Sequence, residues 1–373
     1  MSKAAELAKW GEVSTNGQVS GRRNIVINGA AIVAQRGTTT GQGGAEAMSA
    51  VDRFKVFGGS TAGRLTSSQD SDSPIGFGNS LKLDCTTADT SIAAGEFLLL
   101  EQRLEGQDLQ QLQFNQSSAK TTTISFYVKG NAAAQYTFAL QYHLASGTSR
   151  WFTKGFAVTT SWNRITITIP GDTQASDGSN YGIADDNATG ANLMIWLHGG
   201  TNFSSGTHQD TAWADRGYTT LFQDNQTSFY DATSRTFFIT GLQMEVGSVA
   251  TPFEHRSFGE ELRLCQRYYI LVAEGDGKAI ALGTNYSSSN MYSNIHLPND
   301  MRVAPTIEIA SGTNYYSIFR NGDVDLLDDF FLQRTSTRIV EINNTSDVSG
   351  TAGQAGFIRT ANAASKFALT AEL

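Results

Sequence analysis

The chain has 373 residues, and this length predicts two or three domains, each large enough to bury its own core. Thirty-seven glycines, five prolines and only 17% charged residues favour short strands and tight turns over long amphipathic helices. The net charge of −8 argues against a nucleic-acid partner, and no apolar run approaches the roughly 20 residues of a membrane span. We therefore expect a soluble protein that is made in a cytoplasm and does not insert into a membrane.

The first expected element is a short helix from Ser2 to Trp10, which Ser2 can cap and Gly11 can end. Such a helix is too short to be stable alone in water. We interpret it as a docking peptide that folds against another protein, with Leu7 and Trp10 as its anchors. The alternative is a frayed tag. On either interpretation, residues 1–20 form a helix and linker ahead of the first domain.

From residue 24 onward, strand signals follow one another with no helical pattern between them. The segment 123–129 is the clearest, because Ile124, Phe126 and Val128 alternate with polar or amphipathic residues. The expected strands lie at 25–27, 53–57, 80–85, 97–100, 123–129, 136–142, 165–169 and 193–198. This spacing predicts an antiparallel jelly-roll β-sandwich over residues 21–256.

One long strand over 237–246 is expected to be interrupted by an irregularity in its middle. Phe237 and Ile239 share one face, whereas Leu242 and Met244 follow in the opposite phase after Gly241. Because side chains alternate faces along a strand, a change of phase at a glycine predicts a β-bulge there.

The residues after 256 are expected to form a separate unit. A short helix at 257–267 links it to the first domain, and the remainder, 268–373, is again rich in strand signals. Those strands are expected at 268–272, 278–282, 291–297, 306–309, 316–319, 338–342, 356–359 and 367–371. They predict a second, smaller β-sandwich. The fold class is therefore all-β.

The two cysteines, Cys85 and Cys265, lie in apolar surroundings and are expected to be buried thiols rather than a disulfide or ligands. Two acidic clusters, Asp70-Ser-Asp72 and Asp185-Asp186, suggest calcium. Calcium needs about six to eight oxygen donors, however, and neither cluster has a complete loop pattern. We expect no cofactor, and a structural Ca²⁺ stays open.

Signals of catalysis are mostly absent. The five histidines have no metal-ligand spacing, and no nucleophile elbow or phosphate loop occurs. A glycosidase would need two carboxylates that face each other across a sugar. The candidates Glu96, Glu101, Asp172, Asp185 and Asp210 are interpreted as solvated loop charges. We expect a protein that is not an enzyme.

Aromatic residues in polar loops are the more informative signal, because sugars stack on exposed rings. The stretch from Gly199 to Tyr218 is a long polar loop, and loops of this length are usually functional or disordered. We predict a ligand site there, with Trp213 as the stacking platform. The other candidate ligand residues are Asn202, His208, Asp210, Tyr218, Trp151 and Tyr181. The alternative is that these rings pack against the sandwich.

Many segments resemble a family of bacteriophage tail-fibre and spike proteins, which carry a jelly-roll domain similar to carbohydrate-binding modules. The segments are Asn24-Ile-Val-Ile-Asn-Gly29, Ala34-Gln-Arg-Gly37, Val51-Asp-Arg-Phe54, Gly78-Asn-Ser-Leu-Lys82, Thr123-Ile-Ser-Phe-Tyr-Val-Lys129, Trp162 with Ile169-Pro-Gly-Asp172, Ile239-Thr-Gly-Leu-Gln-Met-Glu245, Leu264-Cys-Gln-Arg-Tyr-Tyr269, Met301-Arg-Val-Ala-Pro-Thr306 and Ala368-Leu-Thr-Ala-Glu-Leu373. These motifs are structural rather than catalytic.

The resemblance implies a virion surface protein that is made in the bacterial host cytoplasm. It would attach to other virion proteins through its N-terminal helix, bind a host cell-surface glycan and form a homotrimer. Two alternatives stay open: a structural decoration or adaptor protein that binds no sugar, and a polysaccharide depolymerase. An exposed aromatic platform favours adhesion, a wholly packed set of rings favours a structural role, and a facing carboxylate pair in a groove favours the enzyme.

Overall fold

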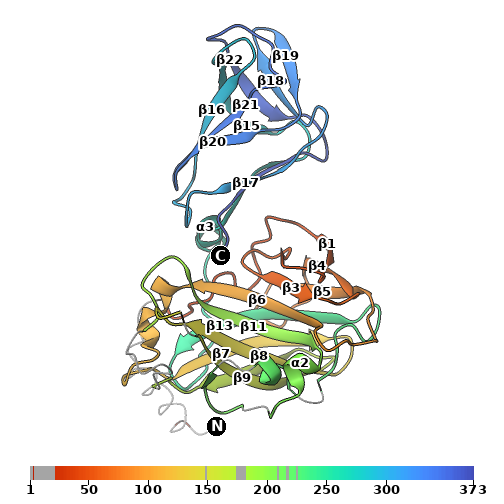
Figure 1. Ribbon diagram of the computed structural model, residues 1–373, viewed down its shortest axis with the longest axis vertical. Coiled ribbons are helices and arrows are strands. Elements are labelled where there is room, and N and C mark those ends of the chain that lie inside the picture. Colours follow the sequence, from red (N-terminus) through yellow and green to blue (C-terminus); the bar gives the residue numbers. More distant parts are fainter. Residues whose placement is uncertain are drawn as a thin grey trace. The chain divides into compact units, whose positions relative to one another are not determined.

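The computed structural model describes residue 3 and residues 22–147, 149–173, 182–207, 210–215, 218–223 and 226–373. The chain forms two compact units (Figure 1). Unit 1 extends to Glu261 and includes Leu373, and unit 2 spans Leu262–Glu372. The predicted docking anchors Leu7 and Trp10 lie outside the described residues.

Unit 1 is a sandwich of two antiparallel sheets. Sheet A has the order β1 (Thr39–Gln42), β4 (Arg64–Asp70), β5 (Ser80–Thr87), β13 (Thr236–Val246), β7 (Thr122–Gly130) and β10 (Asn163–Ile169). Sheet B has the order β12 (Ala214–Asp215), β9 (Ser149–Val158), β8 (Ala134–His143), β11 (Thr189–Gly199), β6 (Phe97–Glu105), β3 (Lys55–Gly59) and β2 (Ala47–Met48). Short helical turns accompany them at η1 (Gly106–Leu112), α2 (Thr201–Ser204) and η2 (Tyr218–Thr220).

The core of unit 1 lies between these sheets, and the inward positions predicted for β7 are confirmed, whereas Ser125 of its other face is also buried. Ile124, Phe126 and Val128 are fully buried, and they share one cluster with Phe138 and Leu140 of β8 on the opposite sheet. Successive side chains of a strand point to opposite faces, so the residues that enter the core between the sheets recur with a period of two.

The predicted bulge in β13 is also confirmed. Gly241 has a φ of +66°, and the register against β7 shifts between Thr240 and Gln243. A Cβ at Gly241 would lie only 2.7 Å from the ring of Phe77 and 3.0 Å from that of Tyr127. Both the backbone conformation and the space therefore require glycine here.

The segment 25–27 was predicted as a strand, and this prediction is wrong, since the structure assigns no strand there. Its backbone nevertheless bonds to β13: Ile25 N donates to Met244 O at 3.0 Å, and Leu242 N donates to Gly29 O at 3.0 Å. Turns between these two bonds interrupt the regular ladder. The sequence shows the apolar pairing but not the interruption.

Unit 2 is a smaller antiparallel sandwich that follows α3 (Phe258–Gln266). Sheet C has the order β14 (Tyr269–Glu274), β23 (Lys366–Thr370) and β17 (Thr306–Ala310). Sheet D has the order β19 (Asp323–Leu327), β18 (Tyr316–Arg320), β22 (Ala355–Thr360), β15 (Ala279–Asn285), β16 (Met291–His296), β21 (Ile339–Asn344) and β20 (Phe331–Thr335). Side chains of both sheets, such as Phe367 of β23 and Ile358 of β22, share one buried cluster.

The predicted all-β class is thus confirmed, with two antiparallel sandwiches in sequence. Cys85 and Cys265 are buried and outside any disulfide, as predicted. No helix within the described part of the chain is long and apolar enough to cross a membrane.

Candidate functional site

The ring of Trp213, the predicted stacking platform, packs against the core of unit 1. Its centroid lies 5.2 Å from that of Phe114, 5.1 Å from Tyr142 and 5.8 Å from Phe152, in edge-on or tilted contacts. The indole Nε1 donates a hydrogen bond of 2.7 Å to the carbonyl oxygen of Pro170. The side chain is therefore half-buried, and its polar group already has a partner.

Of the other residues predicted in this loop, two have a described side chain. Asn202 is exposed in α2, and Asp210 pairs with Lys154 at 2.5 Å. His208 and the side chain of Tyr218 lie outside the described residues, as does Tyr181, so this loop site stays a prediction.

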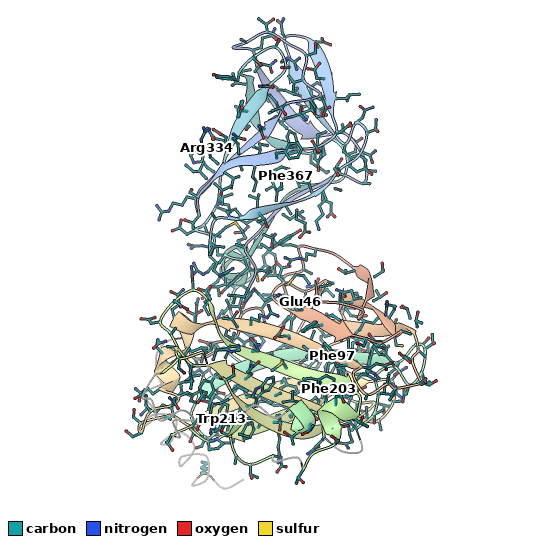
Figure 2. The ribbon with its side chains drawn as sticks, viewed as in Figure 1. Glu46, Phe97, Phe203, Trp213, Arg334 and Phe367 are labelled. Carbon is teal, nitrogen blue, oxygen red and sulfur yellow. The ribbon has the colours of Figure 1, made fainter. Side chains whose placement is uncertain are left out.

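Trp151, the remaining predicted aromatic, lies beneath an apolar layer on the outer face of sheet B. It is 7% exposed and clusters with Met194, Trp196 and the loop residues Leu221 and Phe222. Phe97 and Phe203 extend this cluster and lie with ring centroids 5.5 Å apart (Figure 2). Trp151 therefore presents no open ring face in this structure.

Four of the candidate carboxylates of unit 1 contact basic side chains within the protein: Asp172, Asp210, Glu96 and Glu101. Asp172 accepts hydrogen bonds from Arg150 Nε at 2.5 Å and from the Tyr142 hydroxyl at 2.8 Å. Glu96 lies 3.3 Å from Nε2 of the buried His198. Burial raises the pKa of the Glu101 carboxyl, which the Arg103 guanidinium partly offsets. The interpretation as solvated loop charges is therefore wrong for Glu96, Glu101 and Asp172, which are at most 5% exposed because each contacts a basic side chain inside the sandwich.

The acidic cluster at Asp70-Ser-Asp72 is likewise paired. Asp72 accepts hydrogen bonds from Lys129 Nζ at 2.5 Å and from Trp162 Nε1 at 2.9 Å, and these bonds lower the pKa of its carboxyl. Among the residues that the structure describes, no group of three or more His, Cys, Asp or Glu side chains is placed to hold a metal ion. The calcium expectation stays untested.

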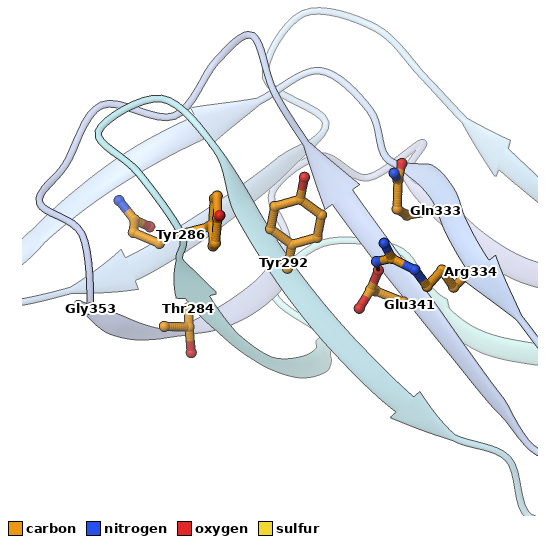
Figure 3. A pocket seen from close by; sticks show the side chains of 8 residues that line it. Thr284, Tyr286, Tyr292, Gln333, Arg334, Glu341 and Gly353 are labelled. Carbon is orange, nitrogen blue, oxygen red and sulfur yellow. Dashed lines mark hydrogen bonds and ion pairs between the residues drawn. The ribbon is translucent and has the colours of Figure 1, made fainter.

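A different arrangement is present on sheet D of unit 2, where a groove of about 660 Å³ lies across four strands. Tyr286 follows the end of β15 and is 76% exposed, and Tyr292 lies on β16. Their rings are nearly perpendicular, at 82°, with centroids 5.7 Å apart. Figure 3 shows both rings at the ends of neighbouring strands, which form an aromatic corner.

Polar groups occupy the other side of this groove. Arg334 of β20 and Glu341 of β21 are cross-strand partners, and Arg334 Nη1 lies 2.8 Å from Glu341 Oε1. The arginine side chain is 76% exposed and the glutamate 21%. A register shift between Leu332 and Arg334 places Gln333 at an irregular point of β20, and Gln333 also lines the groove. Figure 3 shows the ion pair on the far side of Tyr292 from Tyr286.

Local hydrogen bonding fixes the aromatic corner. The register pairs Thr284 with Tyr292, and Tyr286 N donates to Asn290 O at 2.8 Å across the β15–β16 turn. Gly353 N donates to Asn285 O at 2.8 Å, which holds the neighbouring loop against the same strand. Tyr286 is therefore the first residue past the ladder, where no sheet neighbour covers its ring.

The arrangement suits a ligand that has both apolar faces and hydroxyl groups. An aromatic corner offers ring faces to C–H surfaces, while a carboxylate accepts and a guanidinium and an amide donate hydrogen bonds to hydroxyls. Sequence reasoning missed this site. The available signal was Tyr286 in the polar turn Asn285-Tyr-Ser-Ser-Ser-Asn290, because an aromatic residue there has no core-facing strand position.

No protein-family model and no curated protein matches the sequence. Among solved structures, the chain is similar to the enzymatically active domain of tailspike protein 4 of Bacteriophage CBA120, at 10% identity and a TM-score of 0.30. The match covers 60% of this chain and 21% of that chain. The chain thus spans about a fifth of the length of the tailspike domain that it matches.

Two other similar structures are carbohydrate-binding modules. One is the family 11 module of a cellulosomal cellulase of Clostridium thermocellum, at 13% identity and a TM-score of 0.29, over 57% of this chain and 98% of that one. The other is a tandem of two family 22 modules from Paenibacillus barcinonensis, at 10% identity and a TM-score of 0.29, over 95% and 100%. Identities and TM-scores this low carry no argument about what this chain binds.

Proposed function

We propose that this protein binds glycans through the groove on sheet D and that it serves as an adhesion protein on a bacteriophage particle. The observation that carries the binding proposal is the open aromatic corner of Tyr286 and Tyr292 beside the Arg334–Glu341 pair. The virion setting rests on the resemblance of the sequence to tail-fibre and spike proteins. Attachment through Leu7 and Trp10 belongs to the same proposal.

In this proposal, one sugar ring stacks on the face of Tyr286, which is the more exposed of the two tyrosines. Tyr292 supports the second edge of the corner. Glu341 accepts a hydrogen bond from a hydroxyl of the next sugar, and Arg334 donates one from a nitrogen that does not contact Glu341. A charge pair of this kind suits vicinal hydroxyls, because one hydroxyl can donate while its neighbour accepts.

Binding without hydrolysis is the form of the proposal that the groove supports best. Glycoside hydrolysis uses two carboxyl groups on opposite sides of the bond, about 5–10 Å apart. Among the side chains that line the groove, Glu341 supplies one carboxylate, and it is already in an ion pair.

A glycan array with the purified protein, followed by calorimetry on the best ligand, tests this proposal. Arg334→Ala should weaken binding about tenfold, since it removes a donor and leaves Glu341 without its cation. Arg338→Ala is a matched control. Arg338 is the residue before β21, its side chain is 74% exposed, and it pairs with Asp300 outside the groove. Equal losses in both variants, or no glycan bound at all, would overturn the proposal.

A purely structural role, as a decoration or adaptor protein, is the second candidate. It is favoured by the packed rings of Trp213 and Trp151 and by the exposed apolar residues of sheet D. A wild-type protein that binds no glycan on the array, yet incorporates into particles, would select this candidate. A depolymerase is the third, and release of new reducing ends from a bound polysaccharide would reveal it.

A further inference from the structure

An unbroken row of large apolar side chains crosses the outer face of four neighbouring strands in sheet D. The ladder pairs Val324 of β19 with Phe319 of β18, Phe319 with Phe357 of β22, and Phe357 with Leu282 of β15. These strands are consecutive in the strand order of the sheet. The row is therefore a feature of the register rather than a chance scatter of exposed residues.

All members of the row are open to solvent. Val324 is 41% exposed, Phe319 37%, Phe357 57% and Leu282 67%, and Leu326 beside Val324 is 45% exposed. We call these five side chains the apolar row. Large side chains at such exposures contribute on the order of 100 Å² each, so the row exposes roughly 500 Å². This is at the upper end of the largest apolar patch that a monomer normally carries.

Charge on this face is also unusual for a chain with a net charge of −8. Strand alternation places one ionisable side chain on the outer face of these four strands, Arg359 of β22. Its guanidinium carbon lies 4.8 Å from the ring centroid of Phe319 and 5.8 Å from that of Phe357, so it covers the row rather than pairing with a carboxylate. Two copies that meet here bring no carboxylates together.

We propose that the apolar row is the surface through which two copies of this chain associate. Two such faces in contact would bury on the order of 1,000 Å², which reaches the lower limit for a specific protein–protein interface. A patch that contacts its own copy in this way makes an isologous contact, so a two-fold pair is expected. The homotrimer expected from the sequence resemblance stays a prediction, and the same measurement decides between the two.

The row and the glycan groove share β15, because Leu282 and Thr284 lie on the same outer face. Association would cover the β19–β15 half of sheet D and leave Tyr286 and Arg334 at the rim of the interface. A pair of chains would then present two grooves on one assembly. Two linked sites can raise the overall affinity for a repetitive glycan surface well above that of one site.

The test is the mass of the full chain in solution, measured by light scattering and by sedimentation at micromolar concentration. Wild type should have twice the monomer mass. Leu282→Ser and Phe357→Ser together should give a monomer, because they remove the two most exposed members of the row. Ile75→Ser is the matched control, since Ile75 is a fully exposed apolar residue of unit 1 and should leave the mass unchanged.

Thermal unfolding of unit 2 keeps the outcome interpretable, because substitutions at exposed positions should leave a folded protein. Where the double variant fails to fold, Val324→Lys at the edge strand β19 replaces it. A trimer overturns the two-fold pair even where the same substitutions dissociate it, because an isologous contact joins two copies. A monomeric wild type overturns the proposal, as does an oligomer that survives the double variant. Glycan binding by a monomeric variant is measured separately, so failure here leaves the groove proposal standing.

Discussion

The indole Nε1 of Trp213 donates a hydrogen bond of 2.7 Å to the carbonyl oxygen of Pro170, which ties the long loop of unit 1 to the end of β10. The ring also fits among Phe114, Tyr142 and Phe152. Both contacts turn Trp213 toward the core, although the loop that carries it is largely polar. We therefore expect the Trp213 side chain to contribute to the stability of unit 1 rather than to ligand binding.

Trp213→Ala should destabilise unit 1 by about 3 kcal/mol, at the lower end of the range for aromatic-to-alanine changes because the ring is half-buried. For a domain of this size the melting temperature should fall by roughly 6–12 °C. Trp213→Phe keeps most of the ring contacts and should recover much of the loss. An unchanged melting curve together with lost glycan binding would restore the loop as the ligand site.

The buried ion pair beneath this loop should matter as much. Arg150 contacts Asp172 through Nε at 2.5 Å and Nη2 at 3.1 Å, and both side chains are only 3% exposed. Asp172→Asn removes the buried anion, leaves the guanidinium only the exposed Asp215 carboxylate, and should cost about 3 kcal/mol.

A control for that change is built into the same arginine. Arg150 Nη1 also contacts Asp215 at 2.7 Å, but the Asp215 side chain is 69% exposed. Asp215→Asn should therefore cost less than about 1 kcal/mol. Urea unfolding of the two variants measures both costs, and equal values would show that burial does not set the strength of these contacts.

At the groove, Tyr286→Ala should lower glycan affinity by about 2 kcal/mol while the melting temperature stays unchanged, because the ring is 76% exposed and supports no core contact. Tyr286→Phe keeps the ring and should retain most of the affinity if stacking dominates. Calorimetry on both variants separates the ring from the hydroxyl. An equal loss in both would assign the binding to the hydroxyl instead.

Stability should fall in mild acid because of His198. Burial lowers the pKa of this imidazole, although Glu96 and Asp89 act in the opposite direction. The unfolded chain has the ordinary histidine pKa of about 6.5, so below that pH it takes up a proton before the folded protein does. The free energy of unfolding should therefore decrease as pH falls through about 6.5, by up to about 1.4 kcal/mol per pH unit.

Urea titrations at pH 7.5, 6.5 and 5.5 measure this slope. His198→Gln should flatten it, because glutamine has no proton to gain, whereas His296→Gln at an exposed position of β16 should leave it as in wild type. Identical slopes in all three proteins would assign the acid sensitivity to other groups.

Much of the fold could be predicted from the sequence because the large apolar side chains that enter the core recur with a period of two along a strand. The alternation of β7 and the change of phase at Gly241 both follow from that period. The segment 25–27 shows its limit, since an apolar run reveals contact with β13 but not the turns that interrupt the ladder.

The candidate site was less accessible to sequence reasoning. Arg334 and Glu341 meet through the register of β20 on β21, and Tyr292 joins them only through sheet D. Arg334 and Glu341 are seven residues apart in one hairpin, but no local pattern encodes the approach of Tyr292, which is distant in sequence. At Trp213 the polar composition of the loop predicted an exposed ring. Composition does not determine the direction of a single side chain, and here the hydrogen bond to the Pro170 carbonyl directs the ring inward.

The place of β13 in sheet A also has a consequence for how the protein is made. This strand, Thr236–Val246, lies between β5 and β7, and its second half also bonds to the segment that begins with Ile25. A ribosome releases this central strand almost last among the elements of unit 1, after every strand that it joins. The earliest residues of the unit must therefore wait, exposed, until the nascent chain reaches Val246. Sheet A cannot be completed during synthesis until this late strand is made. A pause in translation before β13 would therefore prolong the interval in which the unfinished unit needs chaperones.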